Sequence, residues 1–133
     1  MVGNQEKDID INNLPPATGD LAVRLRMVTQ VGKKYGLDAQ TAGQRAVLTV
    51  TNWNVLKEAT EQAGYRYGMP PHRMGRELRE AVHRIGTSFL KGSVHEGDPV
   101  RTLDAGMDLL KTISAEPGSR DFEEWKEFLD AKV

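Results

Sequence analysis

The chain of 133 residues contains no cysteine, and this absence excludes several kinds of chemistry. Without thiols there is no disulfide framework, no thiolate nucleophile and no zinc site of the cysteine type. Because disulfides belong to oxidising compartments, their absence favours a protein that works inside the cell. We therefore expect a cytoplasmic location.

Long apolar runs are also lacking. No continuous apolar stretch approaches the roughly 20 residues that a membrane-spanning helix needs. The N-terminal sequence MVGNQEKDIDINNLPP contains no apolar segment of the kind found in a signal peptide. The sequence thus predicts neither membrane insertion nor secretion.

The sequence has none of the specific catalytic motifs. There is no phosphate-binding G-x-x-x-x-G-K, no G-x-G-x-x-G after a strand, no H-E-x-x-H and no nucleophile elbow. If His72 and His83 share a helix, they lie three turns apart, about 16 Å along the axis, which is too far for one metal ion. We expect no enzymatic activity, no metal site and no cofactor.

The chain as a whole has little excess of either charge, with a net charge of -1, but its charges are unevenly distributed. Residues 1–20 sum to -3, residues 21–92 to +7 and residues 93–133 to -5. A basic middle between acidic ends suits a surface that binds a polyanion, or one part of the fold that neutralises another. We slightly favour the second interpretation.

Hydrophobic periodicity predicts an all-α fold, a single compact domain of about five helices over residues 17–133, preceded by a flexible tail at residues 1–16. Start and stop signals place the helices at about 18–35, 38–63 and 71–91, from 98 to a break at 116–118, and from 119 onward. The run 46–51 is rich in β-branched residues, but no second strand is available to pair with it. We expect a core that includes Leu25, Val28, Val50, Trp53, Leu78, Ile85, Leu103, Leu110 and Trp125.

The segment 71–91 has the clearest amphipathic pattern, and we expect the fold to be organised around it. Opposite its apolar face, one row of basic side chains follows helical spacing without an interrupting carboxylate: His72, Arg76, Arg79 and His83. We call this row the basic stripe. Beside it, the spacing predicts two ion pairs, Arg73 with Glu77 and Glu80 with Arg84. Gly75 and Gly86 lie on the seam between faces and indicate close approach of another backbone. We favour a tight helix crossing within the fold over the alternative, a phosphate backbone or a partner helix bound there.

The basic stripe and the loop before it suggest nucleic-acid binding. Arginine binds phosphates bidentately, and tyrosine rings stack on exposed bases. The predicted binding residues are Tyr65, Arg66, Tyr67, His72, Arg76, Arg79 and His83. Residues 56–78 also have the outline of a helix-turn-helix, although the connection is longer than usual.

Two other functions fit the same pattern. One is a protein–protein interaction module, such as an adaptor, inhibitor or chaperone, whose basic stripe meets an acidic protein surface. The other is a subunit of a homo-oligomer or larger complex, in which the basic middle of one copy meets the acidic end of the next. Non-enzymatic binding of DNA or RNA is our working hypothesis.

Overall fold

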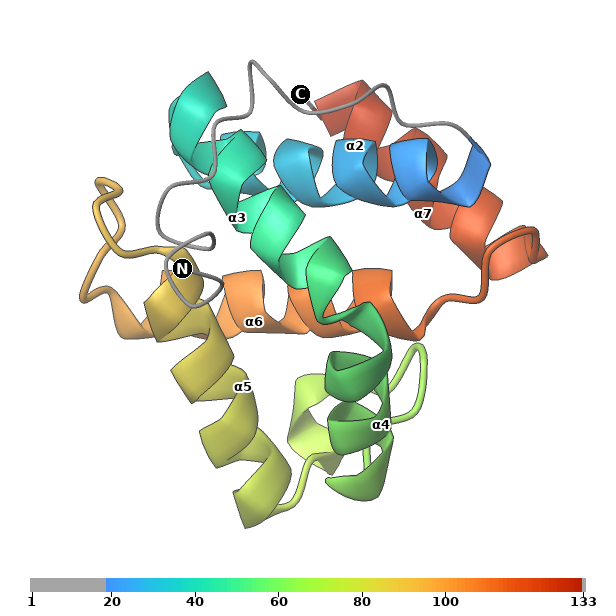
Figure 1. The fold of residues 1–133 in the computed structure, drawn as a ribbon. Coiled ribbons are helices and arrows are strands. Elements are labelled where there is room, and N and C mark those ends of the chain that lie inside the picture. Colours follow the sequence, from blue (N-terminus) through green and yellow to red (C-terminus); the bar gives the residue numbers. More distant parts are fainter. Residues whose placement is uncertain (1–18, 133) are drawn as a thin grey trace, which may run out of the picture.

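The computed structural model describes residues 19–132, which form six α-helices and one short 3-10 helix, with no strand among them (Figure 1). The all-α prediction is confirmed, with one helix more than expected. The predicted tail at residues 1–16 lies outside the described residues. The elements are α2 (Gly19–Lys34), α3 (Ala39–Thr51), α4 (Trp53–Gln62), the 3-10 helix η2 (Pro71–Arg73), α5 (Arg76–Phe89), α6 (Pro99–Ser114) and α7 (Arg120–Lys132).

The additional helix arises because the segment predicted as one helix over 38–63 is broken at Asn52. The Asn52 side-chain amide donates to the carbonyl of Leu48 at 2.9 Å, and the Thr51 hydroxyl donates to the carbonyl of Val47 at 2.7 Å. Such local bonds compete with the helical backbone pattern and favour a bend. The β-branched run 46–51 lies inside α3, so its assignment to a helix is confirmed.

The helix ends follow the predicted chemistry. Asp38 accepts from the amide of Thr41 at 2.8 Å and caps α3. Asp98 caps α6 in the same way, with Pro99 in the first turn. After α2, Gly36 adopts a φ of +86°, a left-handed conformation that glycine reaches without steric cost.

The central helix is α6 rather than α5, so our expectation about the organising segment was wrong. Seven of the sixteen residues of α6 are buried, against four of fourteen in α5. In Figure 1, α6 crosses the middle of the molecule, and it packs against α2, α4 and α5. The amphipathic pattern of α5 is clear because one of its faces is exposed, whereas α6 is covered on several sides. At its start, however, Val100 is 64% exposed.

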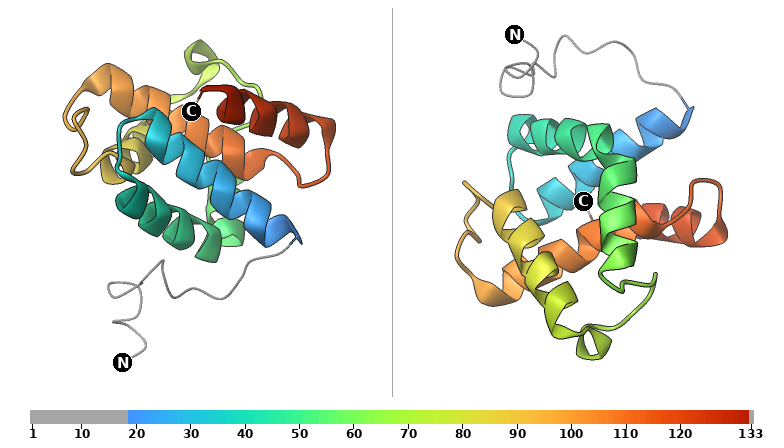
Figure 2. Two further views of the ribbon diagram at one scale, coloured as in Figure 1. Left: turned by 90° about the horizontal axis from the view of Figure 1, so that it is seen from above. Right: turned by 60° about the horizontal axis from the view of Figure 1, so that its bottom comes forward.

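The other half of the core lies around α2, which Figure 2 shows between α3 and α7. Trp53 is 2% exposed, and the guanidinium of Arg24 lies 4.6 Å from the centre of its ring. The Trp125 indole N–H donates to the Thr112 hydroxyl at 2.7 Å, so the only polar atom of this large side chain is satisfied. Both tryptophans are therefore structural, as the spacing predicted.

The closest helix crossing joins α5 to α6 through two glycines. A Cβ atom on Gly86 would lie 2.0 Å from the carbonyl oxygen of Thr102, and one on Gly106 would lie 2.3 Å from that of Val82. Each glycine thus leaves space for the backbone of the other helix. This confirms the tight crossing inferred for Gly86. Gly75 has a different role, because nothing lies within 4 Å of its Cβ position and it is the N-cap of α5.

Candidate nucleic-acid interface

The predicted helix 71–91 begins five residues later than expected, at Arg76. Residues Pro71–Arg73 form η2, and Met74 and Gly75 are extended, with ψ values of 135° and 174°. Proline suits the first turn of a short helix, whereas glycine in a helix interior costs about 1 kcal/mol relative to alanine, so the chain ends one helix before Gly75 and begins another after it. Arg76, Arg79 and His83 therefore share α5, while His72 lies on η2.

All four side chains of the basic stripe are exposed. Arg79 donates from Nη2 to the carbonyl oxygen of Pro71 at 3.1 Å, which ties α5 to η2. Within residues 19–132, the side chains of His72, Arg76 and His83 make no hydrogen bond or ion pair. The Arg79–Pro71 bond therefore joins η2 to α5 across the break in the helix, and no described carboxylate forms an ion pair with the stripe.

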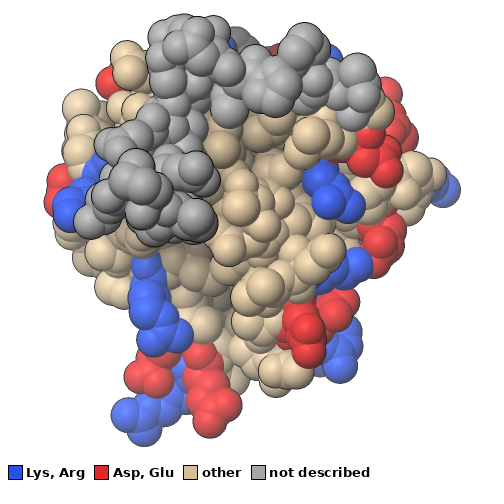
Figure 3. Space-filling model, viewed as in Figure 1, with Lys and Arg blue, Asp and Glu red and all other residues tan. Residues whose placement is uncertain are grey.

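The neighbouring row is not paired with itself, contrary to the prediction. Among the described residues, no ion pair joins Arg73 to Glu77 or Glu80 to Arg84, and all four side chains are exposed. Figure 3 shows side chains of both signs lying side by side over α5. Residues 66–84 contain five arginines and two glutamates, so the excess charge of this region is positive.

Elsewhere three cations of the basic middle of the chain pair with carboxylates of the acidic end. Arg26 pairs with Asp130 at 2.9 Å, Lys34 pairs with Asp108 at 2.7 Å, and Lys57 pairs with Glu116. The interpretation of internal neutralisation is confirmed for these three cations. It does not extend to the arginines of residues 66–84, none of which forms an ion pair within the described part of the chain.

The structure places Tyr65 in the interior rather than on the interface. Its side chain is 2% exposed and packs among Met74, Leu78, Val82 and Leu110. Burial is the main cause that raises the pKa of the Tyr65 hydroxyl to about 12. The ring is therefore unavailable for stacking on a base.

A sequence signal for this position existed but was missed. Gly64 is the C′ residue of α4, with φ of +99°, and the amide of Tyr65 donates to the carbonyl of Thr60 at 3.1 Å. This is a Schellman motif, in which the residue after the glycine commonly packs back against the helix. An aromatic residue directly after a C′ glycine is thus more typical of a core residue than of a binding platform.

Arg66 and Tyr67 differ from Tyr65 in exposure. Arg66 is exposed and donates from Nη1 to the carbonyl of Tyr65 at 2.9 Å. Tyr67 is half-buried, and its hydroxyl donates to the carbonyl of Asp121 at 3.2 Å. Burial and the nearby Asp121 raise the pKa of the Tyr67 hydroxyl. Arg66 therefore adds an exposed cation to the loop before η2, whereas Tyr67 mainly connects this loop to α7.

The N-terminus of α5 lies among the basic side chains. Gly75 has no side chain that can cap the helix, so no side chain binds the first free amides of α5 at this position. Such amides carry partial positive charge and commonly bind anions. His72, Arg73, Arg76 and Arg79 lie within one turn of these amides in the sequence. Positive charge from the backbone and from these side chains thus coincides here, beside the one carboxylate of the first turn, Glu77.

The outline of a helix-turn-helix is not realised. Residues 63–75, including η2, separate α4 from α5. A DNA-reading motif places its two helices about a turn of three or four residues. The geometry offers no recognition helix of that type.

Residues 19–132 contain no group of three or more histidine or acidic side chains placed to hold a metal ion. No helix in this range combines the length and apolar character needed to cross a bilayer. No family model matches the chain, and neither a curated protein nor a solved structure is significantly similar to it.

Proposed function

We propose that this protein binds nucleic acid without enzymatic chemistry, through a basic surface at the start of α5. We define the basic surface as Arg66, His72, Arg73, Arg76, Arg79 and His83. The observation that supports this proposal is a difference in ion pairing between these arginines and other cations of the chain. Three other cations of the middle region meet the acidic end of the chain, whereas the arginines at 66–84 have no carboxylate partner in the described residues.

The basic surface suits phosphate groups better than bases. A guanidinium donates two parallel hydrogen bonds to phosphate oxygens, and the free amides at the start of α5 add donors of the same kind. Stacking on Tyr65 is not available because its ring is buried. Phosphate contacts carry no direct sequence information, so we expect binding that depends little on base sequence.

Salt dependence of binding tests this proposal. Labelled single-stranded and duplex DNA and RNA are titrated with the protein at two salt concentrations, and affinity is followed by fluorescence anisotropy. Each phosphate contact contributes about 0.9 to the slope of log affinity against log salt for a duplex. Arg76→Ala with Arg79→Ala should therefore lower the slope by roughly two.

A matched control removes two other exposed cations, Lys33 and Lys91. Neither forms an ion pair in the described residues, and neither belongs to the basic surface. Lys33→Ala with Lys91→Ala changes the net charge equally and should leave the slope nearly unchanged. An equal loss in both double variants would show attraction by net charge alone and would reject the basic surface.

Failure to bind any of the four nucleic acids at low salt would reject the proposal and favour the alternative, a protein–protein interaction module that meets an acidic partner. Self-assembly of the basic middle with the acidic end is tested separately by mass in solution. Because three such ion pairs already form within one chain, we expect no head-to-tail assembly through them. A mass that rises with protein concentration would contradict this.

A further inference from the structure

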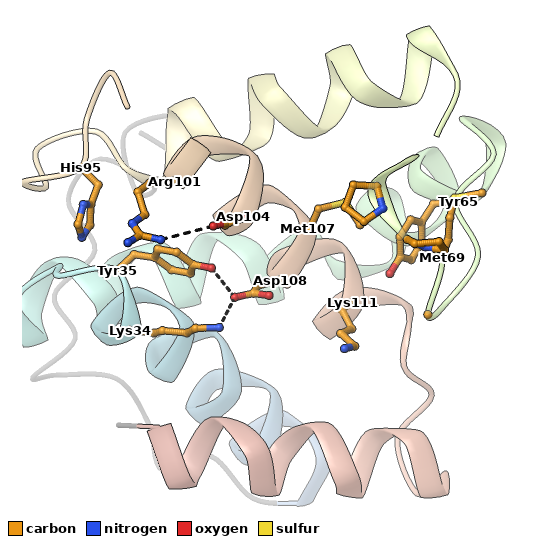
Figure 4. A pocket seen from close by; sticks show the side chains of 13 residues that line it. Lys34, Tyr35, Tyr65, Met69, His95, Arg101, Asp104, Met107, Asp108 and Lys111 are labelled. Atoms are coloured by element: carbon orange, nitrogen blue, oxygen red, sulfur yellow. Dashed lines mark hydrogen bonds and ion pairs between the residues drawn. The ribbon is translucent and has the colours of Figure 1, made fainter. Parts of the chain in front are cut away.

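A pocket of about 740 Å³ lies beside α6 and is also lined by the end of α2 and by the segment that leads into η2. Its volume falls within the range of about 300 to 1,000 Å³ that small-molecule sites occupy. In Figure 4, His95 and Arg101 lie at one end and Tyr65 and Met69 at the other. The first end is polar and the second is largely apolar.

Both carboxylates of the pocket already have partners from the same chain. Asp108 Oδ2 lies 2.7 Å from Lys34 Nζ and accepts a hydrogen bond from the Tyr35 hydroxyl at 2.6 Å. Burial and the adjacent Asp108 raise the pKa of Tyr35, which keeps its proton on the hydroxyl as the donor. Asp104 pairs with Arg101 at 3.6 Å. These carboxylates are therefore poor candidates for binding a cationic ligand.

Lys111 differs from Lys34 and Arg101 of the same pocket, which are both paired with a carboxylate. Its side chain forms no ion pair in the described part of the chain, and its Nζ lies 4.4 Å from the centre of the Trp125 ring. Lys34 Nζ lies 5.8 Å from the same ring. Two ammonium groups thus lie near one indole ring. Asp108 is within ion-pair distance of Lys34 only. Since both lysines are partly buried, water compensates this excess positive charge less well than at the surface.

The opposite end supplies apolar contact. Met69, Pro70, Pro71 and Met107 are among the residues that line the pocket, and Figure 4 shows Met69 beside Tyr65 at this end. Methionine side chains adapt to flat rings and make favourable contacts with them. In Figure 4, Lys34 and Lys111 enter the same space from α2 and α6, between the polar end and this apolar wall.

We infer that this pocket binds a small organic oxyanion with a flat apolar body, the anionic group between Lys34 and Lys111 and the body against Met69 and Met107. Carboxylate and phosphate share the chemistry that two ammonium groups recognise. None of the residues that line the pocket belongs to the basic surface, and the inference does not rest on nucleic-acid binding.

Three naphthalene compounds that differ only in their head group test the inference. Binding of 2-naphthoate, 2-naphthyl phosphate and the uncharged 2-naphthol is measured by isothermal titration calorimetry on the full chain. We expect the two anions to bind at least tenfold more tightly than 2-naphthol, and the ratio between them shows which head group is preferred. Equal affinity for all three, or no binding of either anion at millimolar concentration, would overturn the inference.

Variants of Lys111 locate the site. Lys111→Met preserves length without charge and should weaken binding of the anions at least tenfold, whereas Lys111→Arg should retain most of it. Lys33→Met, on an exposed position of the same helix as Lys34, serves as the control and should bind normally. Circular dichroism confirms that each variant is folded. Unchanged affinity in folded Lys111→Met would show that the anions bind elsewhere.

Discussion

α5 has two faces that differ in whether the rest of the chain supplies their partners. The inner face buries Leu78, Val82, Gly86 and Phe89 against α6 and the loop that precedes η2. The outer face presents Arg76, Arg79 and His83 to solvent, and only Arg79 bonds to another part of the described chain. The inner face is thus explained by folding, whereas the outer face contributes little to it. A feature that folding leaves unexplained is the best place to look for function.

The largest effect is expected where the inner face approaches α6. At Gly86 any side chain meets the Thr102 carbonyl oxygen, a backbone atom that no rotamer change can move. Overpacking typically costs about 1 to 3 kcal/mol, and a backbone clash exceeds that range. Gly86→Leu should therefore lower the free energy of unfolding by more than about 3 kcal/mol or prevent folding. This change in the free energy of unfolding is measured by urea titration, with circular dichroism as the signal.

Gly75 is the matched control, because the space at its Cβ position is open and its φ of -74° suits any residue. Gly75→Ala should cost at most about 1 kcal/mol, since alanine is a poorer N-cap than glycine. If Gly86→Leu were as stable as Gly75→Ala, the close crossing of α5 and α6 would not exist in solution.

A second test of the inner face is to raise the pH, which should lower the free energy of unfolding. The pKa of Tyr65, which packs on Leu78 and Val82, is raised to about 12 from an ordinary value of about 10. The folded protein therefore holds this proton more tightly than the unfolded chain does. The resulting stability is complete below about pH 10 and is lost as pH rises toward 12. A difference of two units corresponds to about 2 to 3 kcal/mol.

Tyr65→Phe should reduce this alkaline loss, as measured by urea unfolding between pH 9 and 11.5. Tyr67→Phe is the control, because Tyr67 is only half-buried and should leave most of the loss in place. Tyr35 also has a raised pKa, so some dependence on pH remains in both variants. Identical pH profiles for Tyr65→Phe and the parent protein would contradict the burial of this hydroxyl.

The inner face was largely predictable from the sequence because periodicity reports which residues are buried. Leu78 and Val82 follow the apolar spacing, and Gly86 was correctly attributed to a helix crossing. Periodicity does not report which helix is most surrounded, so α6 was not recognised as the centre. The break at Asn52 was missed for another reason: the bonds from its side chain and from Thr51 to the backbone depend on rotamers that the sequence does not specify.

The outer face was predictable in composition but not in arrangement. The spacing that assigned His72 to the basic stripe assumed one continuous helix, and Gly75 ends that continuity. The pocket beside α6 was not predicted at all. Its lysines, Lys34 and Lys111, come from helices far apart in the sequence, and only the tertiary fold brings both to Trp125.

The smallest effect on stability is expected on the outer face. Arg76→Ala with Arg79→Ala breaks no ion pair within residues 19–132, and alanine is the strongest helix former. It removes the exposed hydrogen bond from Arg79 to Pro71, so the free energy of unfolding should change by less than about 0.5 kcal/mol per substitution. Leu78→Ala, on the same helix but facing inward, should cost about 2 to 5 kcal/mol in the same urea experiment. If the double arginine variant were destabilised as much as Leu78→Ala, these arginines would serve folding, and their lack of carboxylate partners would no longer indicate a ligand.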